Sequence, residues 1–127
     1  MPREAIRPTT VHSVKAYSHA IKNGKIVHLA GQIALDPQGR LVGKGDIEAQ
    51  AEQVFANIKA VVEAAGGTMQ NIAKITTFTT NLAYRPKIAD VRAKYFPADP
   101  PASTFLVISS LAEPDFLVEI EAVAVLE

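Results

Sequence analysis

Apolar residues along the chain follow two kinds of spacing, one typical of helices and one typical of strands. In residues 47–65 they recur every three or four positions, which predicts an amphipathic helix with one buried face. Asp46 is a suitable N-cap for this helix, and the glycine pair that follows position 65 favours its end. A second helix is expected between Pro86, which suits a first helical turn, and Pro97, which a helix rarely passes.

Five shorter segments are rich in β-branched and other strand-forming residues and are bounded by turn residues. They predict strands at residues 14–21, 25–33, 72–80, 104–109 and 117–126. Asn23 and Gly24 tolerate positive φ and indicate a tight hairpin between the first two strands. The expected order is therefore β-β-α-β-α-β-β, an α+β fold with one mixed sheet and both helices on one of its faces.

The last predicted strand indicates what the helices leave uncovered. Because side chains alternate between the two faces along a strand, one set can point toward the helices and the other away from them. The inward set is Val118, Ile120, Ala122 and Ala124, and the outward set is Leu117, Glu119, Glu121, Val123 and Val125. The outward face is partly apolar, which predicts that the protein associates with copies of itself.

The chain of 127 residues has the size of one domain, so residues 1–127 are expected to form a single unit. The 13 Lys and Arg residues balance 13 Asp and Glu residues, and zero net charge argues against nucleic acid or an anionic membrane as a partner. There is no cysteine, which excludes disulfides and thiolate chemistry. No segment approaches the ~20 apolar residues of a membrane span, and a cytoplasmic protein is expected.

No general motif for phosphate, zinc, calcium or a hydrolase nucleophile occurs in the sequence. Glu119 and Glu121 lie two positions apart on a predicted strand and share a face, where apolar neighbours can raise the pKa of one of them for proton transfer. Both carboxylates can equally pair with basic groups across a subunit boundary. His12, His19 and His28 lack the spacing of a metal site, so neither a metal nor another cofactor is expected.

Several strings in the sequence resemble the Rid family of proteins, also known as the YjgF family. They are residues 24–33 (GKIVHLAGQI), 50–66, 95–97 (YFP), 101–104 (PAST) and 118–125 (VEIEAVAV). The resemblance covers nearly all of the chain. It implies a chorismate-mutase-like fold and a homotrimer in which small-molecule ligands bind in clefts between subunits. Such a trimer accounts for the uncovered sheet face.

The resemblance also implies roles for two residues. Family members that deaminate 2-aminoacrylate-type imines use an arginine after Pro-Ala to hold the substrate carboxylate, and a glutamate near the C-terminus to help activate water. The glutamate position is Glu119, the implied catalytic residue, but the arginine position is Ser103. A serine has neither the charge nor the paired donors of a guanidinium, so simple amino-acid imines are expected to be poor substrates.

The rest of the implied site is partly retained. Tyr17 and Gly31 match the family, whereas a usual serine is Ala30 here, a frequent cysteine is Phe105 and an asparagine is Ala89. The cleft is therefore expected to be less polar than in other members. The expected substrate-binding residues are Tyr17, Ala30, Gly31, Ser103 and Phe105.

Two functions are consistent with these residues. The first is an imine or enamine deaminase, a hydrolase acting on carbon–nitrogen bonds, in which Glu119 polarises water. The second is a non-catalytic, regulatory trimer that binds a small, mostly apolar metabolite. The retained glutamate favours the enzyme, because a carboxylate is costly to keep in a cleft unless it is paired or used. Ribonuclease activity, suggested by an older family label, has little support from a chain with zero net charge.

Overall fold

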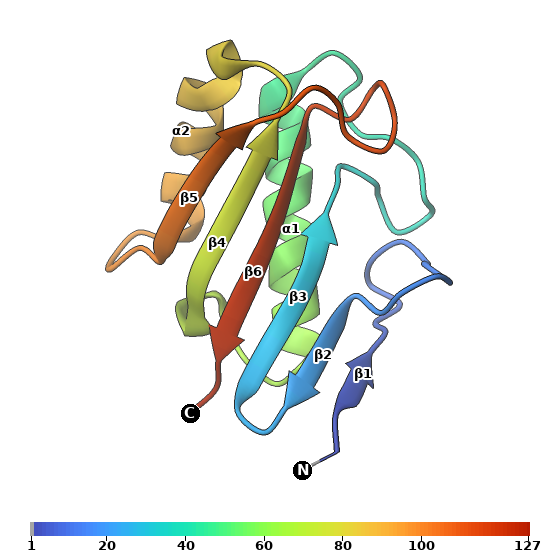
Figure 1. The fold of residues 1–127 in the computed structure, drawn as a ribbon, viewed down its shortest axis with the longest axis vertical. Helices are drawn as coiled ribbons and strands as arrows, with labels where there is room; N and C mark the ends of the chain where they lie inside the picture. Colours follow the sequence, from blue (N-terminus) through green and yellow to red (C-terminus); the bar gives the residue numbers. More distant parts are fainter. Residues whose placement is uncertain (1) are drawn as a thin grey trace.

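The computed structural model describes residues 2–127 as one twisted sheet covered on one side by two helices (Figure 1). The strands are β1 (Glu4–Ile6), β2 (Ala20–Asn23), β3 (Ile26–Gln32), β4 (Ile72–Thr79), β5 (Ala102–Val107) and β6 (Val118–Val125). The helices are α1 (Ile47–Ala64) and α2 (Arg85–Tyr95), with short 3-10 turns η1 (Met69–Asn71) and η2 (Leu82–Tyr84). No helix within residues 2–127 is long and apolar enough to cross a membrane.

The sheet has the strand order β1-β2-β3-β6-β4-β5. All neighbouring strands are antiparallel except β4 and β5, which are parallel and are connected through α2. The predicted α+β fold, with one mixed sheet and two helices on the same face, is confirmed. Because β5 forms one edge of the sheet, its outer backbone groups have no strand partner among the described residues.

The N-terminal part of the chain differs from the prediction. The strand expected at residues 14–21 begins only at Ala20, and the short strand β1 was not expected. Residues 7–19 form a loop instead, which is held by hydrogen bonds from side chains to carbonyl groups rather than by a strand ladder. The hairpin between β2 and β3 is present, with Gly24 at φ 63° as the first residue of its turn.

The two helices begin and end where the sequence indicates. The Asp46 carboxylate accepts a hydrogen bond from the Ala49 amide at 3.1 Å, and Gly66 adopts φ 94° just after α1. Phe55 of α1 stacks on Tyr95 at 5.4 Å between ring centroids, which fixes α2 beside α1. The buried face of α1 comprises Gln50, Ala51, Val54, Phe55, Asn57, Ile58, Val61 and Val62.

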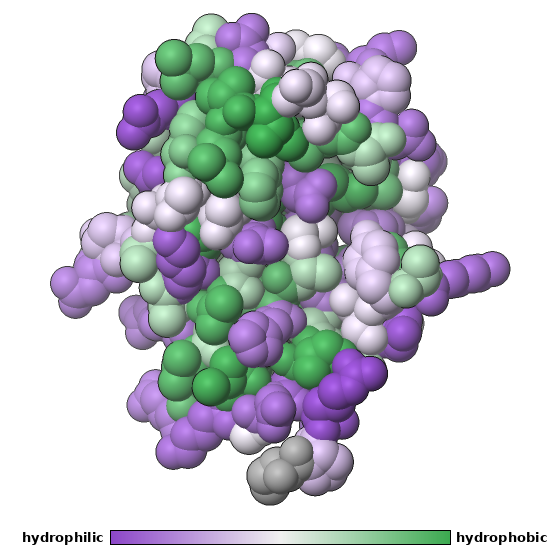
Figure 2. Space-filling model, in the orientation of Figure 1, coloured by the Kyte–Doolittle hydropathy of each residue, from purple (hydrophilic) through white to green (hydrophobic). Residues whose placement is uncertain are grey.

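The opposite face of the sheet is left open. Along β6 the residues alternate as predicted: Val118, Ile120, Ala122 and Ala124 are buried against the helices, whereas Glu119, Glu121, Val123 and Val125 are half-buried or exposed. Figure 2 views this face and shows apolar side chains interrupted by polar ones. Two of the exposed apolar residues, Ile26 (45%) and Val125 (47%), are cross-strand neighbours. An uncovered apolar surface of this kind is typical of a self-association surface.

Candidate functional site

The Glu119 carboxyl group lies on the open face of the sheet, beside an irregularity in β3. Leu29 pairs with Ala122 and Gln32 pairs with Ile120, so Ala30 and Gly31 together stand opposite the single residue Glu121. This is the arrangement of a β-bulge, which bends a strand and commonly occurs next to functional sites.

Gly31 allows the Glu119 side chain to pack directly on the backbone of this bulge. A Cβ atom at position 31 would lie 2.8 Å from Glu119 Cδ and 2.9 Å from Cγ, closer than any real side chain tolerates. The absence of a side chain at Gly31 therefore makes the room that the carboxyl group occupies. Gly31 and Glu119, both among the predicted site residues, therefore lie in contact within a single chain.

Tyr17 also belongs to this group, although it lies in the loop of residues 7–19 and not on a strand. The Arg7 guanidinium holds the loop by donating hydrogen bonds from Nη1 to the carbonyl oxygens of Val14 at 3.3 Å and Tyr17 at 3.1 Å. Partial burial, and then the negative charge of Glu119, raise the pKa of the Tyr17 hydroxyl. The hydroxyl therefore stays protonated at neutral pH and can donate a hydrogen bond.

The Glu119 carboxyl group has a pKa above its ordinary value. Burial is the main cause, and repulsion from the neighbouring Glu121 carboxylate adds to it. Among residues 2–127, no Lys, Arg or His nitrogen lies within 4.0 Å of Glu119 to offset these effects. A half-buried carboxyl group without a basic partner is suited to accepting and returning a proton.

Ser103 and Phe105, two further predicted site residues, lie on the other face of the sheet. In the parallel pair of β4 and β5, Ser103 stands beside Ile75 and Phe105 beside Thr77, and both partners are buried on the helix side. Glu119 points to the open side. One chain therefore brings Tyr17, Ala30, Gly31 and Glu119 together and keeps Ser103 and Phe105 apart from them.

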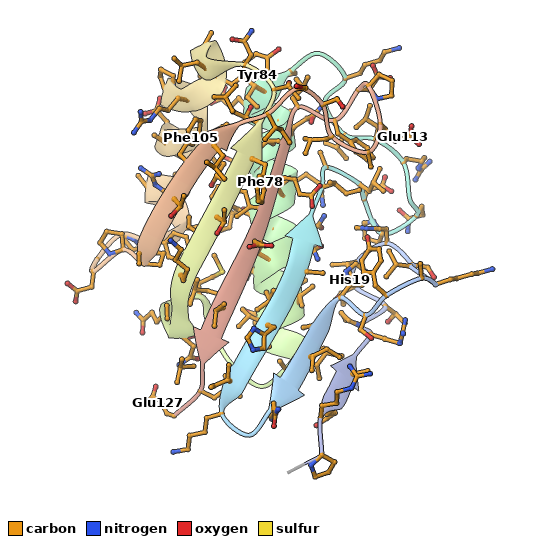
Figure 3. All side chains as sticks on the ribbon, in the orientation of Figure 1. His19, Phe78, Tyr84, Phe105, Glu113 and Glu127 are labelled. Atoms are coloured by element: carbon orange, nitrogen blue, oxygen red, sulfur yellow. The ribbon has the colours of Figure 1, made fainter. Side chains whose placement is uncertain are left out.

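Ser103 and Phe105 line a hollow of about 410 Å³ between the edge strand β5 and α2. Its other lining residues are Arg85, Arg92, Pro100 and Pro101. The Arg85 guanidinium lies over the Phe105 ring, 5.2 Å from its centroid (Phe105 is labelled in Figure 3). The two arginines were not among the predicted site residues, although their spacing of seven residues places them on the same side of a helix.

The histidines have structural surroundings. His19 and His12 are buried, and both ring nitrogens of His19 have partners: Nε2 lies 2.7 Å from the His12 carbonyl oxygen and Nδ1 lies 3.1 Å from Gln32 Nε2. Burial, together with the adjacent His19, lowers the pKa of His12. His28 is exposed on β3. In the described part of the chain, no three His, Asp or Glu residues are grouped as metal ligands.

The influence of Glu121 on Glu119 gives a prediction for pH titration. Glu121→Gln removes a negative charge two positions away on the same face, so the pKa of Glu119 is expected to fall by less than about one unit, since a charge pair near water is worth on the order of 1 kcal/mol. Burial should still hold it above the ordinary value. NMR of the side-chain carboxyl carbon measures this, with Glu113→Gln, an exposed loop change, as control. An unchanged Glu119 titration would rule out the coupling.

Comparison with known proteins identifies the family. The family model described as Endoribonuclease L-PSP matches residues 8–126. A RutC family protein of Pyrococcus horikoshii is 42% identical over 108 residues, 85% of each chain. A 2-iminobutanoate/2-iminopropanoate deaminase of Dermatophagoides farinae is 34% identical over 120 residues, 94% of this chain and 93% of that protein.

The fold comparison agrees. A solved structure of the Rid family protein YyfA from Yersinia pestis superimposes with a TM-score of 0.93 at 36% identity, covering 98% of this chain and 100% of that one. The match of the family model to almost the whole chain, the related sequences and the shared fold lead to one conclusion. This chain belongs to the Endoribonuclease L-PSP family, to which the Rid proteins belong.

Proposed function

We propose that the protein is a deaminase of a reactive imine or enamine, with Glu119 as its catalytic residue. The observation that carries the proposal is the Glu119 carboxyl group, half-buried on the Gly31 bulge with a raised pKa and no basic partner among residues 2–127. A relative that is 34% identical and is named a 2-iminobutanoate/2-iminopropanoate deaminase supports this reaction class.

In the proposed reaction, water adds to the carbon of the C=N bond. The imine is protonated on nitrogen, and the Glu119 carboxylate takes a proton from the water as the new C–O bond forms, which gives a neutral carbinolamine. The Glu119 carboxyl group then returns its proton to the amine nitrogen. As the C–N bond breaks, the electrons of the O–H bond form the C=O bond, and the hydroxyl proton leaves with ammonia as ammonium. The protonated Tyr17 hydroxyl donates a hydrogen bond that orients the water or the substrate.

The active site is proposed to form between subunits. In one chain, Glu119 and Gly31 lie on the open face of the sheet, whereas Ser103 and Phe105 lie on the helix side of the edge strand β5. A homotrimer that covers the open apolar face, with a small-molecule cleft at each boundary, combines the first group from one subunit with the second from its neighbour. Closed rotational symmetry then gives three equivalent clefts.

Ser103 narrows the choice of substrate. Its single hydroxyl cannot form the two-point ion pair by which a guanidinium holds a carboxylate. We therefore propose that the preferred substrate is not a simple amino-acid imine, in which the carboxylate is attached directly to the C=N carbon.

Ammonia release tests this proposal. Imines generated in situ should include ones without a carboxylate, ones with the carboxylate on the C=N carbon, and ones with the carboxylate separated from it by an apolar group. We expect acceleration over buffer for at least one class, and the smallest acceleration for simple amino-acid imines. If no imine is hydrolysed faster than in buffer, the enzyme proposal is wrong and a binding function takes its place.

A further inference from the structure

We infer that Arg85 and Arg92 of α2 form an anion-binding subsite that holds a carboxylate at the end of an apolar substrate body. The inference deepens the proposed function, on which its kinetic consequence rests. The two arginines line the same hollow as Ser103 and Phe105, between β5 and α2. The two arginines belong to α2, and they place positive charge beside Ser103 of β5.

The positive charge in the hollow has no counter-charge within the described residues. Neither Arg85 nor Arg92 has a carboxylate oxygen within 4.0 Å, and no Asp or Glu lines the hollow. Other basic residues contrast with them: Arg40 pairs with Asp36 at 3.4 Å, and Lys94, also on α2, pairs with Glu52 at 2.7 Å. Two unpaired guanidinium groups in one concave site favour binding of an anion.

The donors of the hollow favour a carboxylate over a spherical ion, because a guanidinium presents a planar fork of N–H groups that matches two carboxylate oxygens. Arg85 is oriented by its position over the Phe105 ring, 5.2 Å from the centroid, which leaves its N–H groups free for a planar acceptor. Arg92 is half-buried, so its side chain has fewer alternative positions. The Ser103 hydroxyl forms no hydrogen bond with another described residue and can donate to the same acceptor.

The remaining lining of the hollow indicates what the carboxylate is attached to. Pro100, Pro101 and the Phe105 ring contribute apolar surface to the hollow, against which an apolar group can pack. An apolar body with a terminal carboxylate satisfies both this surface and the arginines. Such a ligand differs from a small amino-acid imine, whose carboxylate adjoins the reacting carbon, and is compatible with a serine at position 103.

Direct binding of a simple probe tests the subsite without any need for turnover. Benzoate is to be titrated into the full-length protein by calorimetry, with benzamide as its neutral counterpart of similar shape. We expect benzoate to bind at millimolar concentration and benzamide to bind at least about tenfold more weakly, because hydrogen bonds to a charged group carry the difference. Equal binding of both probes, or no binding of benzoate, overturns the inference.

Variants then assign the binding to the two arginines. Arg85→Gln combined with Arg92→Gln is expected to weaken benzoate binding by about tenfold or more, whereas Lys87→Gln, an exposed change elsewhere on α2, should leave it unchanged. If Arg92→Lys replaces Arg92→Gln in the double variant, the charge returns without the fork of donors, and benzoate affinity should recover only in part. Thermal unfolding of each variant shows that the fold is retained, and unchanged benzoate affinity in the double variant contradicts the inference.

The subsite and the proposed reaction can fail separately. If benzoate binding depends on the arginines but no imine is hydrolysed, the subsite stands and the deaminase proposal is wrong. If an imine with a distant carboxylate is hydrolysed, the double variant should raise KM by about tenfold with little change in kcat, because the arginines bind ground state and transition state alike. Hydrolysis with an unchanged KM contradicts the subsite alone.

Discussion

Glu119→Gln is expected to lower the rate of imine hydrolysis by about a hundredfold or more, in line with the loss of a general base or acid. The amide keeps the shape of the side chain against Gly31, but it cannot take a proton from water at neutral pH. The rate of ammonia release with a hydrolysed imine measures the effect. Because the side chain is only half-buried, the variant should fold with unchanged thermal stability.

The matched control is Glu121→Gln, two residues further along the same face of β6. Glu121 is exposed and has no packing contact comparable to that of Glu119 with Gly31. Its replacement should keep kcat within a few-fold and displace only the acid limb of the pH–rate profile, toward lower pH. A Glu119→Gln variant that retains most of its activity would remove Glu119 from the mechanism and with it the main support for the enzyme.

Glu119→Gln can also test whether the proposed cleft forms between two subunits. Glu119→Gln damages the open-face half of the cleft, and Ser103→Tyr is expected to block the other half by filling the hollow beside β5. If each cleft takes one half from each of two neighbours, trimers re-formed from equal amounts of both inactive variants regain about a quarter of the wild-type activity, because one boundary in four combines two intact halves. A site contained within one chain would give no recovery.

Patterns within single elements gave reliable predictions. The cap at Asp46, the glycine after α1 and the alternation along β6 each depend on interactions between residues close in the sequence, and all three are present. The prediction that a strand begins at residue 14 was wrong, because side chains and not a neighbouring strand hold the backbone of residues 14–19. Arg7 donates to two carbonyl groups of the segment and His19 contacts the His12 carbonyl, so the backbone forms a loop.

The candidate site could be predicted only in part, for a related reason. The resemblance identified Glu119 and Gly31, and the close packing of the two follows from a bulge that no local pattern reveals. The separation of Ser103 from Glu119 depends on the register of β5 beside β4, which places Ser103 next to the buried Ile75. The arginines of α2 were missed because the direction of a long side chain depends on the elements packed around it.

Gln50→Leu is expected to destabilise the protein by about 3–5 kcal/mol, although it preserves the size of the side chain. Gln50 is fully buried on α1, and its amide donates to the carbonyl oxygens of Gly43 at 3.1 Å and Asp115 at 2.8 Å. Its side-chain oxygen accepts from the Leu117 amide at 2.9 Å. Leucine would leave the Asp115 carbonyl and the Leu117 amide without their partner in a partly buried site, whereas the Gly43 carbonyl keeps the Asp46 amide at 2.9 Å.

These hydrogen bonds hold the connection that enters β6, so their loss should also disturb the position of Glu119 two residues beyond Leu117. Urea unfolding at one fixed protein concentration measures the change, because a self-associating protein gains apparent stability with concentration. Gln70→Leu, an exposed change in η1, is the control and should alter the unfolding free energy by less than about 0.5 kcal/mol. A loss below about 1 kcal/mol for Gln50→Leu would mean that water or relaxed backbone satisfies the Asp115 carbonyl and the Leu117 amide, and that the entry to β6 does not depend on α1.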